Sequence, residues 1–340
     1  MKMFIKIMLI FLLILFITDI AAGFYFYHIS VARTKKDFLK NDSALTGSYT
    51  TEVQSAVNTQ EEVLAVNAKL FSPPPDADTE NEKVEIDWFN KQPYKEVNIT
   101  SDEGLNLVGY YLAAKEPTYK TAILAHGYSA QGTFMGTYAK IYYDMGYNVL
   151  LPDDRGHGKS GGSYIGFGWA DRKDYMKWID YVIDTEGENS QIILHGVSMG
   201  GATVLMTSGE SLPDNVKAIV SDCAYTSVKD ELVYQLKRLY HLPSFPILDT
   251  TSILSKIRAG YSFEEASALK QVKLSKTPTL FIHGDADKFV PFEMVKELYQ
   301  ACSSEKELFV VPGAGHGAAY DTDTAGYKNR VREFAEKYIR

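Results

Sequence analysis

The chain has 340 residues, and its 35 Lys and Arg against 43 Asp and Glu give a formal charge of −8, which argues against a nucleic-acid-binding protein. Hydrophobic residues make up 45% of the chain and aromatic residues 13%, which excludes a long disordered protein and allows a large core. The two cysteines, Cys223 and Cys302, are too few for a disulfide scaffold or a four-cysteine zinc site, and we expect no bridge between them.

The first 30 residues form a predicted membrane-targeting segment. Residues 7–17 are apolar without interruption, Lys2 and Lys6 precede them, and the apolar character resumes over residues 21–29. A buried helix of a soluble protein keeps a polar stripe, which this segment does not have. The apolar span approaches the roughly 20 residues that a helix needs to cross a bilayer.

This segment is either a cleaved signal peptide or a retained anchor. The small residues 21–23 could serve as a cleavage site, whereas the aromatic run at residues 24–27 is typical of a helix end at the membrane interface. Basic residues flank the segment on both sides, so charge does not decide its orientation. We predict a single N-terminal membrane anchor that leaves the rest of the chain outside the cytoplasm, and a secreted protein if the segment is cleaved.

Residues 31–93 are predicted to be a polar tether that is partly helical. Residues 41–81 are rich in Ser, Thr, Asn, Glu and Ala, and apolar residues between positions 53 and 70 give a weakly amphipathic helical pattern. The three consecutive prolines at 73–75 would end that helix. We therefore place the start of the folded domain at residue 94 and its end at residue 340.

After residue 94, short β-rich runs alternate with helical segments. Eight strands are predicted, at residues 96–100, 105–112, 121–125, 148–152, 191–195, 216–221, 278–283 and 307–311. The later runs are continuously apolar, as in parallel strands that helices cover on both faces. The pattern predicts an α/β fold with an eight-stranded, mostly parallel, doubly wound sheet whose first two strands form an antiparallel hairpin.

The fifth of these strands runs directly into Gly196-Val197-Ser198-Met199-Gly200-Gly201, and helix-forming residues follow. A G-x-S-x-G motif alone can arise by chance, but the strand before it and the helix after it favour a nucleophilic serine. Such a turn needs glycines two residues to either side of Ser198, because a Cβ there would collide with neighbouring elements. Met199 would then begin a helix and point its N–H group at a developing oxyanion.

With this motif, the sequence from Tyr94 to the C-terminus resembles the α/β-hydrolase superfamily and is similar to its bacterial membrane-anchored serine-aminopeptidase-like and lysophospholipase-like branch. The resemblance implies the α/β-hydrolase fold with a helical cap, and the chain order Ser, acid, His. The H-G-x-x-D-x-x-V-P pattern that begins at His283 implies Asp287 as the acid, with Asp285 as the alternative. The glycine-flanked His316 matches the general base, and a surface-loop histidine is the alternative interpretation.

Two further loops match the same family. The turn that follows the third strand contains Tyr128, and the resemblance implies that its N–H group is the second oxyanion donor beside Met199. Residues 154–161 resemble the D-x-R-G-x-G-x-S loop, which we interpret as architectural because a phosphate-binding loop has a different spacing. We expect no cofactor and no metal, since no histidine-rich ligand set surrounds the acid loop. The remaining histidines of these motifs are expected to brace loops: His126, His157, His195 and His283.

A cap insertion is predicted at about residues 224–276, where the chain is longer than one helix requires and rich in apolar and aromatic residues. These residues either pack on the sheet's edge or form an apolar acyl pocket. We predict a serine hydrolase that cleaves carboxylic esters with Ser198, His316 and Asp287. The alternatives are a serine peptidase of the aminopeptidase type, for which Glu264 and Glu265 could hold a substrate amine, and a non-catalytic binding protein. The expected partners are a small-molecule ester or peptide substrate and, through the N-terminal segment, a membrane; the oligomeric state stays open.

Overall fold

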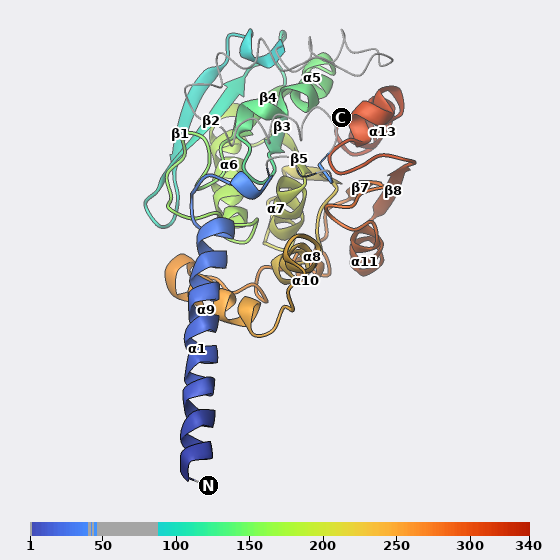
Figure 1. Ribbon diagram of the computed structural model, residues 1–340. Coiled ribbons are helices and arrows are strands. Elements are labelled where there is room, and N and C mark those ends of the chain that lie inside the picture. The colour runs from blue at the N-terminus through green and yellow to red at the C-terminus, as the bar shows by residue number, and fades with distance from the viewer. Residues whose placement is uncertain (1, 40–41, 43, 46–87) are drawn as a thin grey trace.

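An eight-stranded sheet forms the centre of the computed structural model, which describes residues 2–39, 42, 44–45 and 88–340 (Figure 1). The strand order is β1-β2-β4-β3-β5-β6-β7-β8. The β1–β2 and β2–β4 pairs are antiparallel, and the other pairs are parallel. The strands are β1 (Lys95–Thr100), β2 (Asn106–Leu112), β3 (Lys120–Ala125), β4 (Asn148–Pro152), β5 (Gln191–Val197), β6 (Val216–Asp222), β7 (Thr279–Gly284) and β8 (Lys306–Val311). The predicted fold class is confirmed, and every predicted strand is present.

Helices cover both faces of this sheet, which explains why the central strands are apolar along their whole length. On one face, Trp178 of α6 and Leu298 of α11 belong to the same buried cluster as residues of α7. On the other face, Tyr142 of α5 and Phe334 of α13 belong to a second cluster. The helices of the two layers are α5 (Gly136–Asp144), α6 (Asp171–Glu186), α7 (Met199–Thr207), α11 (Glu293–Ala301) and α13 (Thr324–Tyr338), with the short η2 (Gly132–Met135) and α12 (Ala319–Thr322).

The predicted cap is helical and lies between β6 and β7. It consists of α8 (Val228–Tyr240), α9 (Ile247–Ala259) and the short α10 (Ala268–Gln271). Helix α8 begins where the Ser227 hydroxyl accepts a hydrogen bond from the Asp230 N–H group, and it ends at His241 in the left-handed conformation. The cap therefore begins on the same edge of the sheet at which the serine turn follows β5.

The N-terminal helix α1 (Lys2–Ser30) is long and apolar, and its first half projects away from the rest of the molecule (Figure 1). Its length and composition suffice for a membrane span, a property that signal sequences near the N-terminus share. Its second half packs against α9. A Cβ at Gly23 would lie 2.5 Å from Thr250 Cγ2, so this glycine allows the two helices to approach closely.

The described residues after α1 lie against the part of the molecule that contains the sheet. The Ile165 N–H group donates to Val31 O at 2.7 Å, and the Arg33 guanidinium donates to Ser160 O at 2.7 Å. The short η1 (Asp37–Leu39) follows and buries Leu39. Most of the predicted tether, including its helical pattern at 53–70 and the prolines at 73–75, lies outside the described residues.

Candidate active site

Ser198 lies on the turn between β5 and α7, in a strained backbone conformation with φ 59° and ψ −119°. Its N–H group donates to Asp222 O at 2.8 Å, which fixes the turn against β6. A Cβ at Gly196 would lie 2.0 Å from Gly200 O, and a Cβ at Gly200 would lie 2.0 Å from Ala125 O. The close approach of backbone to backbone is therefore the reason for both glycines, as the sequence predicted.

The structure brings the three predicted catalytic residues together. His316 Nε2 lies 2.8 Å from Ser198 Oγ, and His316 Nδ1 lies 2.8 Å from Asp287 Oδ2. All three residues are buried. They come from three separate loops, after β5, β7 and β8, which end at the same edge of the sheet because these strands are parallel.

Asp287 is held as an anion. Its Oδ1 accepts from the N–H groups of Phe289 at 2.8 Å and Val290 at 2.9 Å, and its Oδ2 also faces His283 Nε2 at 3.2 Å. Burial alone would raise its pKa, but the charge of His316 and hydrogen bonds from His283 and His316 outweigh burial and hold the pKa well below its usual range. An anionic Asp287 orients His316 with Nδ1 protonated, which leaves Nε2 free to accept the Ser198 proton.

Asp285, the alternative acid, binds the neighbouring loop instead of His316. Its Oδ1 accepts a hydrogen bond from the Gly313 N–H group at 2.6 Å. That bond ties the loop after β7 to the loop after β8, which carries His316. Asp285 thus organises the turn, and Asp287 is the carboxylate that lies against the imidazole.

Both predicted oxyanion residues lie beside Ser198 and line the same pocket. Met199 is the first residue of α7, and Tyr128 lies in the loop after β3. Two buried histidines hold that loop: His126 Nδ1 bonds to Gly127 O at 2.8 Å, and His157 Nε2 accepts from Ser129 N at 3.2 Å. Burial lowers the pKa of both imidazoles, so each stays neutral and offers one donor and one acceptor nitrogen.

The loop at residues 154–161 is tied to neighbouring elements by ion pairs of Arg155. The Arg155 guanidinium donates twice to Asp174 of α6, at 2.7 and 2.8 Å, and once to Glu103 at 2.7 Å. His195 lies farther down the sheet between the Tyr142 and Tyr327 hydroxyls, each at 3.0 Å. These contacts agree with the architectural role expected for residues 154–161 and with the structural role expected for His195.

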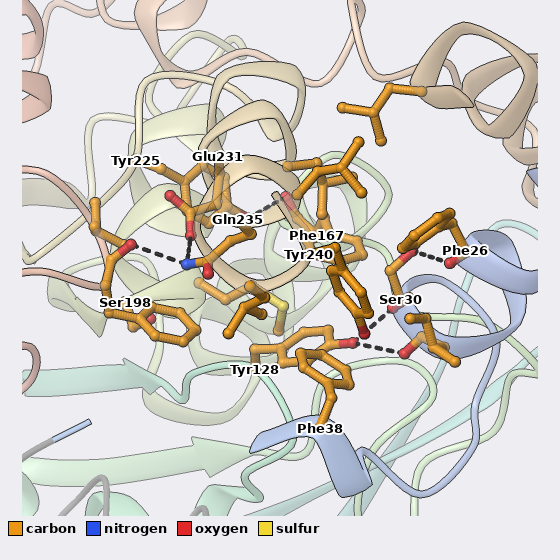
Figure 2. Close-up of a pocket in the computed structure, with 18 residues that line it drawn as sticks. Phe26, Ser30, Phe38, Tyr128, Phe167, Ser198, Tyr225, Glu231, Gln235 and Tyr240 are labelled. Atoms are coloured by element: carbon orange, nitrogen blue, oxygen red, sulfur yellow. Dashed lines mark hydrogen bonds between the residues drawn. The ribbon is translucent and has the colours of Figure 1, made fainter. Parts of the chain in front are cut away.

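An apolar pocket extends from Ser198 to the end of α1 (Figure 2). Apolar walls of this kind are typical of a small-molecule site. The sheet side contributes Tyr128 and Met199, and the cap contributes leucines of α8 and Leu248 of α9. The cap therefore forms one wall of an apolar pocket beside Ser198.

One carboxyl group lies in this pocket among the described residues. Glu231 of α8 is buried; Gln235 Nε2 donates to its Oε1 at 2.6 Å, while its Oε2 has no hydrogen-bond partner. Burial raises its pKa to about 8, so the group is neutral at pH 7. The sequence analysis did not identify Glu231, because nothing in its neighbourhood distinguishes it from the other charged residues of α8.

The two glutamates considered as amine ligands lie elsewhere. Glu264 accepts from Lys229 Nζ at 2.9 Å, and Glu265 accepts from Lys256 Nζ at 2.9 Å. Both are paired on the outer surface of the cap, and neither lines the pocket that holds Ser198.

The pocket also contains residues from the N-terminal segment, which the sequence analysis missed. Phe26, Ile29 and Ser30 of α1 and Phe38 of η1 line the wall opposite Ser198 (Figure 2). The sequence placed Phe26 in an interfacial belt, whereas the structure buries it against Tyr240 with the ring centroids 5.2 Å apart. No local pattern separates a lipid-facing aromatic residue from one that faces a pocket.

One group of possible metal ligands occurs within the described part of the chain, and it overlaps the catalytic residues: Cys223, Asp287 and His316, with ligand atoms within 4.8 Å of one another. A metal would need the Cys223 thiolate. Burial, together with the nearby Asp222 and Asp287 charges, raises the pKa of this thiol well above its usual value. The arrangement therefore suits proton transfer between Ser198, His316 and Asp287 better than metal binding.

Comparison with known proteins places this site in a family. The sequence profile of the prolyl oligopeptidase family matches residues 132–340, a range that contains Ser198, Asp287 and His316. Bacillus subtilis YqkD is 29% identical over 259 residues, which cover 76% of this chain and 85% of that protein. The Saccharomyces cerevisiae membrane protein YNL320W is 24% identical over 248 residues, 71% of this chain and 79% of that protein. The structure of the Pyrococcus furiosus esterase Pf2001 superposes with a TM-score of 0.62 at 26% identity, covering 75% of this chain and 94% of that chain. The fold is that of the α/β hydrolases, as the sequence resemblance implied.

Proposed function

We propose that this chain, which belongs to the prolyl oligopeptidase family, is a serine hydrolase that transfers the acyl group of a carboxylic ester to water. The observation that carries the proposal is the buried chain of hydrogen bonds from Asp287 through His316 to Ser198, at one end of an apolar pocket. A serine hydroxyl becomes a useful nucleophile at neutral pH only beside an oriented base, and this arrangement supplies one.

The proposed reaction has two halves. Ser198 Oγ attacks the ester carbonyl while His316 Nε2 takes its proton, and Asp287 stabilises the imidazolium that forms. The N–H groups of Tyr128 and Met199 hold the oxyanion of the tetrahedral intermediate. His316 then gives its proton to the departing alcohol, activates a water molecule, and so releases the acid and regenerates Ser198.

Ester cleavage is favoured over peptide cleavage by the pocket. It is apolar, and its one carboxyl group among the described residues, Glu231, is neutral at pH 7 and therefore a poor ligand for a substrate ammonium group. The likeness to the Pf2001 esterase agrees with this choice. A serine peptidase is the second candidate, because the matching family is a peptidase family. A non-catalytic binding protein would have no need of the hydrogen-bonded Ser198, His316 and Asp287.

We also propose that α1 is a retained membrane anchor, with the catalytic domain outside the cytoplasm. The small residues 21–23 lie within a continuous helix, and Gly23 is buried against α9, so the segment on both sides of them is part of one helix packed on the folded body. The yeast relative is named a membrane protein, which agrees with an anchor. In this proposal residues 1–30 form the anchor, residues 31–93 connect it, and residues 94–340 form the catalytic domain with its cap at about 224–276.

The test compares the full chain in detergent with Ser198→Ala on p-nitrophenyl esters and aminoacyl-naphthylamides. We expect ester hydrolysis and fluorophosphonate labelling that both disappear in Ser198→Ala. Ser208→Ala, at the end of α7 and away from the pocket, is the matched control and should retain both. Preferential amide cleavage would favour the peptidase, and ester turnover that survives in Ser198→Ala would refute the assignment.

A further inference from the structure

The helix α1 forms one wall of the pocket in which Ser198 lies. Figure 2 shows Ser198 at one end of the pocket and Phe26 and Ser30 at the other, with Tyr128 between them. Phe26 is only 8% exposed, so it faces protein and pocket rather than the surroundings of the molecule. An acyl chain whose carbonyl carbon lies at Ser198 would therefore run toward the end of α1.

This wall is fixed in place by polar contacts. The Tyr128 hydroxyl donates to Ser30 O at 2.7 Å, so the residue that carries a proposed oxyanion donor also binds the last turn of α1. Lys36 Nζ donates to Ile29 O at 2.9 Å and to Ala32 O at 2.7 Å, which satisfies carbonyl groups at the helix end. A fragment that begins at residue 94 would lack this wall.

The same helix continues out of the domain with an apolar surface on every side. Its side chains from Met3 to Ile17 are exposed, as expected for a segment that lies in lipid. Beside it, the cap exposes Phe245 and Ile257, each 74% exposed, and Ile253, which is 61% exposed. Figure 1 shows α9 next to α1 at the end of the body from which the free half of α1 projects. Exposed apolar side chains that are continuous with a membrane span mark a surface in contact with the bilayer.

We infer that the substrate is a long-chain carboxylic ester held in the bilayer, and that its acyl chain enters the pocket along the end of α1 and the adjoining cap. This inference rests on the proposed hydrolase function. Moving an alkyl chain from water into an apolar pocket gains about as much free energy per CH₂ group as moving it into a bilayer. The acyl chain of the substrate can therefore move from the bilayer into an apolar pocket at little cost in free energy, provided that the pocket adjoins the bilayer. The helix α1, which lines the pocket and continues out of the domain, connects the pocket with the bilayer.

The first experiment tests the wall of the pocket that α1 forms, which we call the acyl wall, separately from the catalytic residues. The full chain is reconstituted in phosphatidylcholine vesicles and assayed on p-nitrophenyl palmitate in the same vesicles and on p-nitrophenyl acetate in solution. Ile29→Trp narrows the pocket, and Ile10→Trp makes the same change on the exposed half of α1. We expect Ile29→Trp to lower kcat/KM at least tenfold more for palmitate than for acetate, while Ile10→Trp changes neither.

Equal effects of Ile29→Trp on the two esters, or no effect on palmitate, would overturn the inference. If Ile29→Trp fails to fold and loses acetate turnover as well, Phe26→Ala decides instead, since an enlarged pocket should move the chain-length optimum to longer esters. An unchanged optimum would count against α1 as the acyl wall. If the unmodified protein did not hydrolyse the acetate ester at all, the proposed hydrolase function itself would be refuted.

The second experiment identifies the source of the ester. Palmitate ester and protein are placed either in the same vesicles or in separate vesicles. We expect at least a tenfold higher initial rate when they share a bilayer. Equal rates would show that the ester reaches the pocket through water, which would refute entry from the membrane.

Discussion

Replacing Glu231 by Gln should change the way in which the stability of the protein depends on pH. Glu231 lies buried in the apolar pocket, and burial raises its pKa to about 8. The hydrogen bond from Gln235 and the charge of Arg238 act in the opposite direction, and the charge of Asp287 adds to the rise. The carboxyl group is therefore neutral in the folded protein between pH 4.5 and about 8, where it would be ionised in the unfolded chain.

The magnitude follows from the two pKa values. The ordinary value is 4.5 and the folded value is about 8, so the folded state holds one more proton than the unfolded state between these two pH values. The stabilisation that this proton gives is fully present below pH 4.5 and is lost as the pH rises toward 8. At about 1.4 kcal/mol per pKa unit, the free energy of unfolding falls by about 5 kcal/mol across this window. A glutamine at this position does not titrate and contributes no such loss.

The assay is the melting temperature of the full chain in detergent between pH 5 and pH 8, for the unmodified protein and for Glu231→Gln. Between pH 5 and pH 8 the loss amounts to about 4 kcal/mol. With about 2 °C per kcal/mol for a domain of this size, the melting temperature of Glu231→Gln should rise relative to the unmodified protein by roughly 8 °C over this range. Glu264→Gln is the matched control, because Glu264 lies on the outer surface of the cap and its pKa is below 4.5. Parallel pH profiles for Glu231→Gln and the unmodified protein would refute the neutral, buried carboxyl group.

Three further substitutions test the site and its supports. Asp287→Asn should lower kcat about 10⁴-fold with little change in the circular dichroism of the protein, because an amide favours the wrong tautomer of His316; a loss below tenfold would contradict the assignment. Gly200→Ala should prevent folding, since its Cβ would lie 2.0 Å from a carbonyl oxygen at the end of β3, and a soluble variant with native circular dichroism would contradict this steric argument. Arg155→Lys should lower the free energy of unfolding by about 3 kcal/mol, because lysine cannot make the two parallel bonds to the buried Asp174; denaturant unfolding measures the change, and a loss below 1 kcal/mol would contradict the role of the pair.

The sequence determined the fold class and the local chemistry of each loop. Ser198 could be identified because the glycines around it meet a local steric requirement, which a short motif records. The central strands could be placed because parallel strands buried on both faces are continuously apolar. For the acid, the sequence left two carboxylates two residues apart, Asp285 and Asp287, and only the path of the loop showed which one lies 2.8 Å from His316.

The tertiary structure alone decided what surrounds the nucleophile. Phe26 and Ile29 are separated from Ser198 by more than 160 positions in the chain, and their apolar character suits a bilayer as well as a pocket. The hydrophobic effect is not directional, so an apolar sequence predicts burial but not the partner. The same holds for Glu231, whose neutral state follows from the packing of α8 over the pocket and not from its neighbours in sequence. Residue types and spacing therefore determine the chemistry of the loops, whereas long-range packing decides which surfaces meet around them.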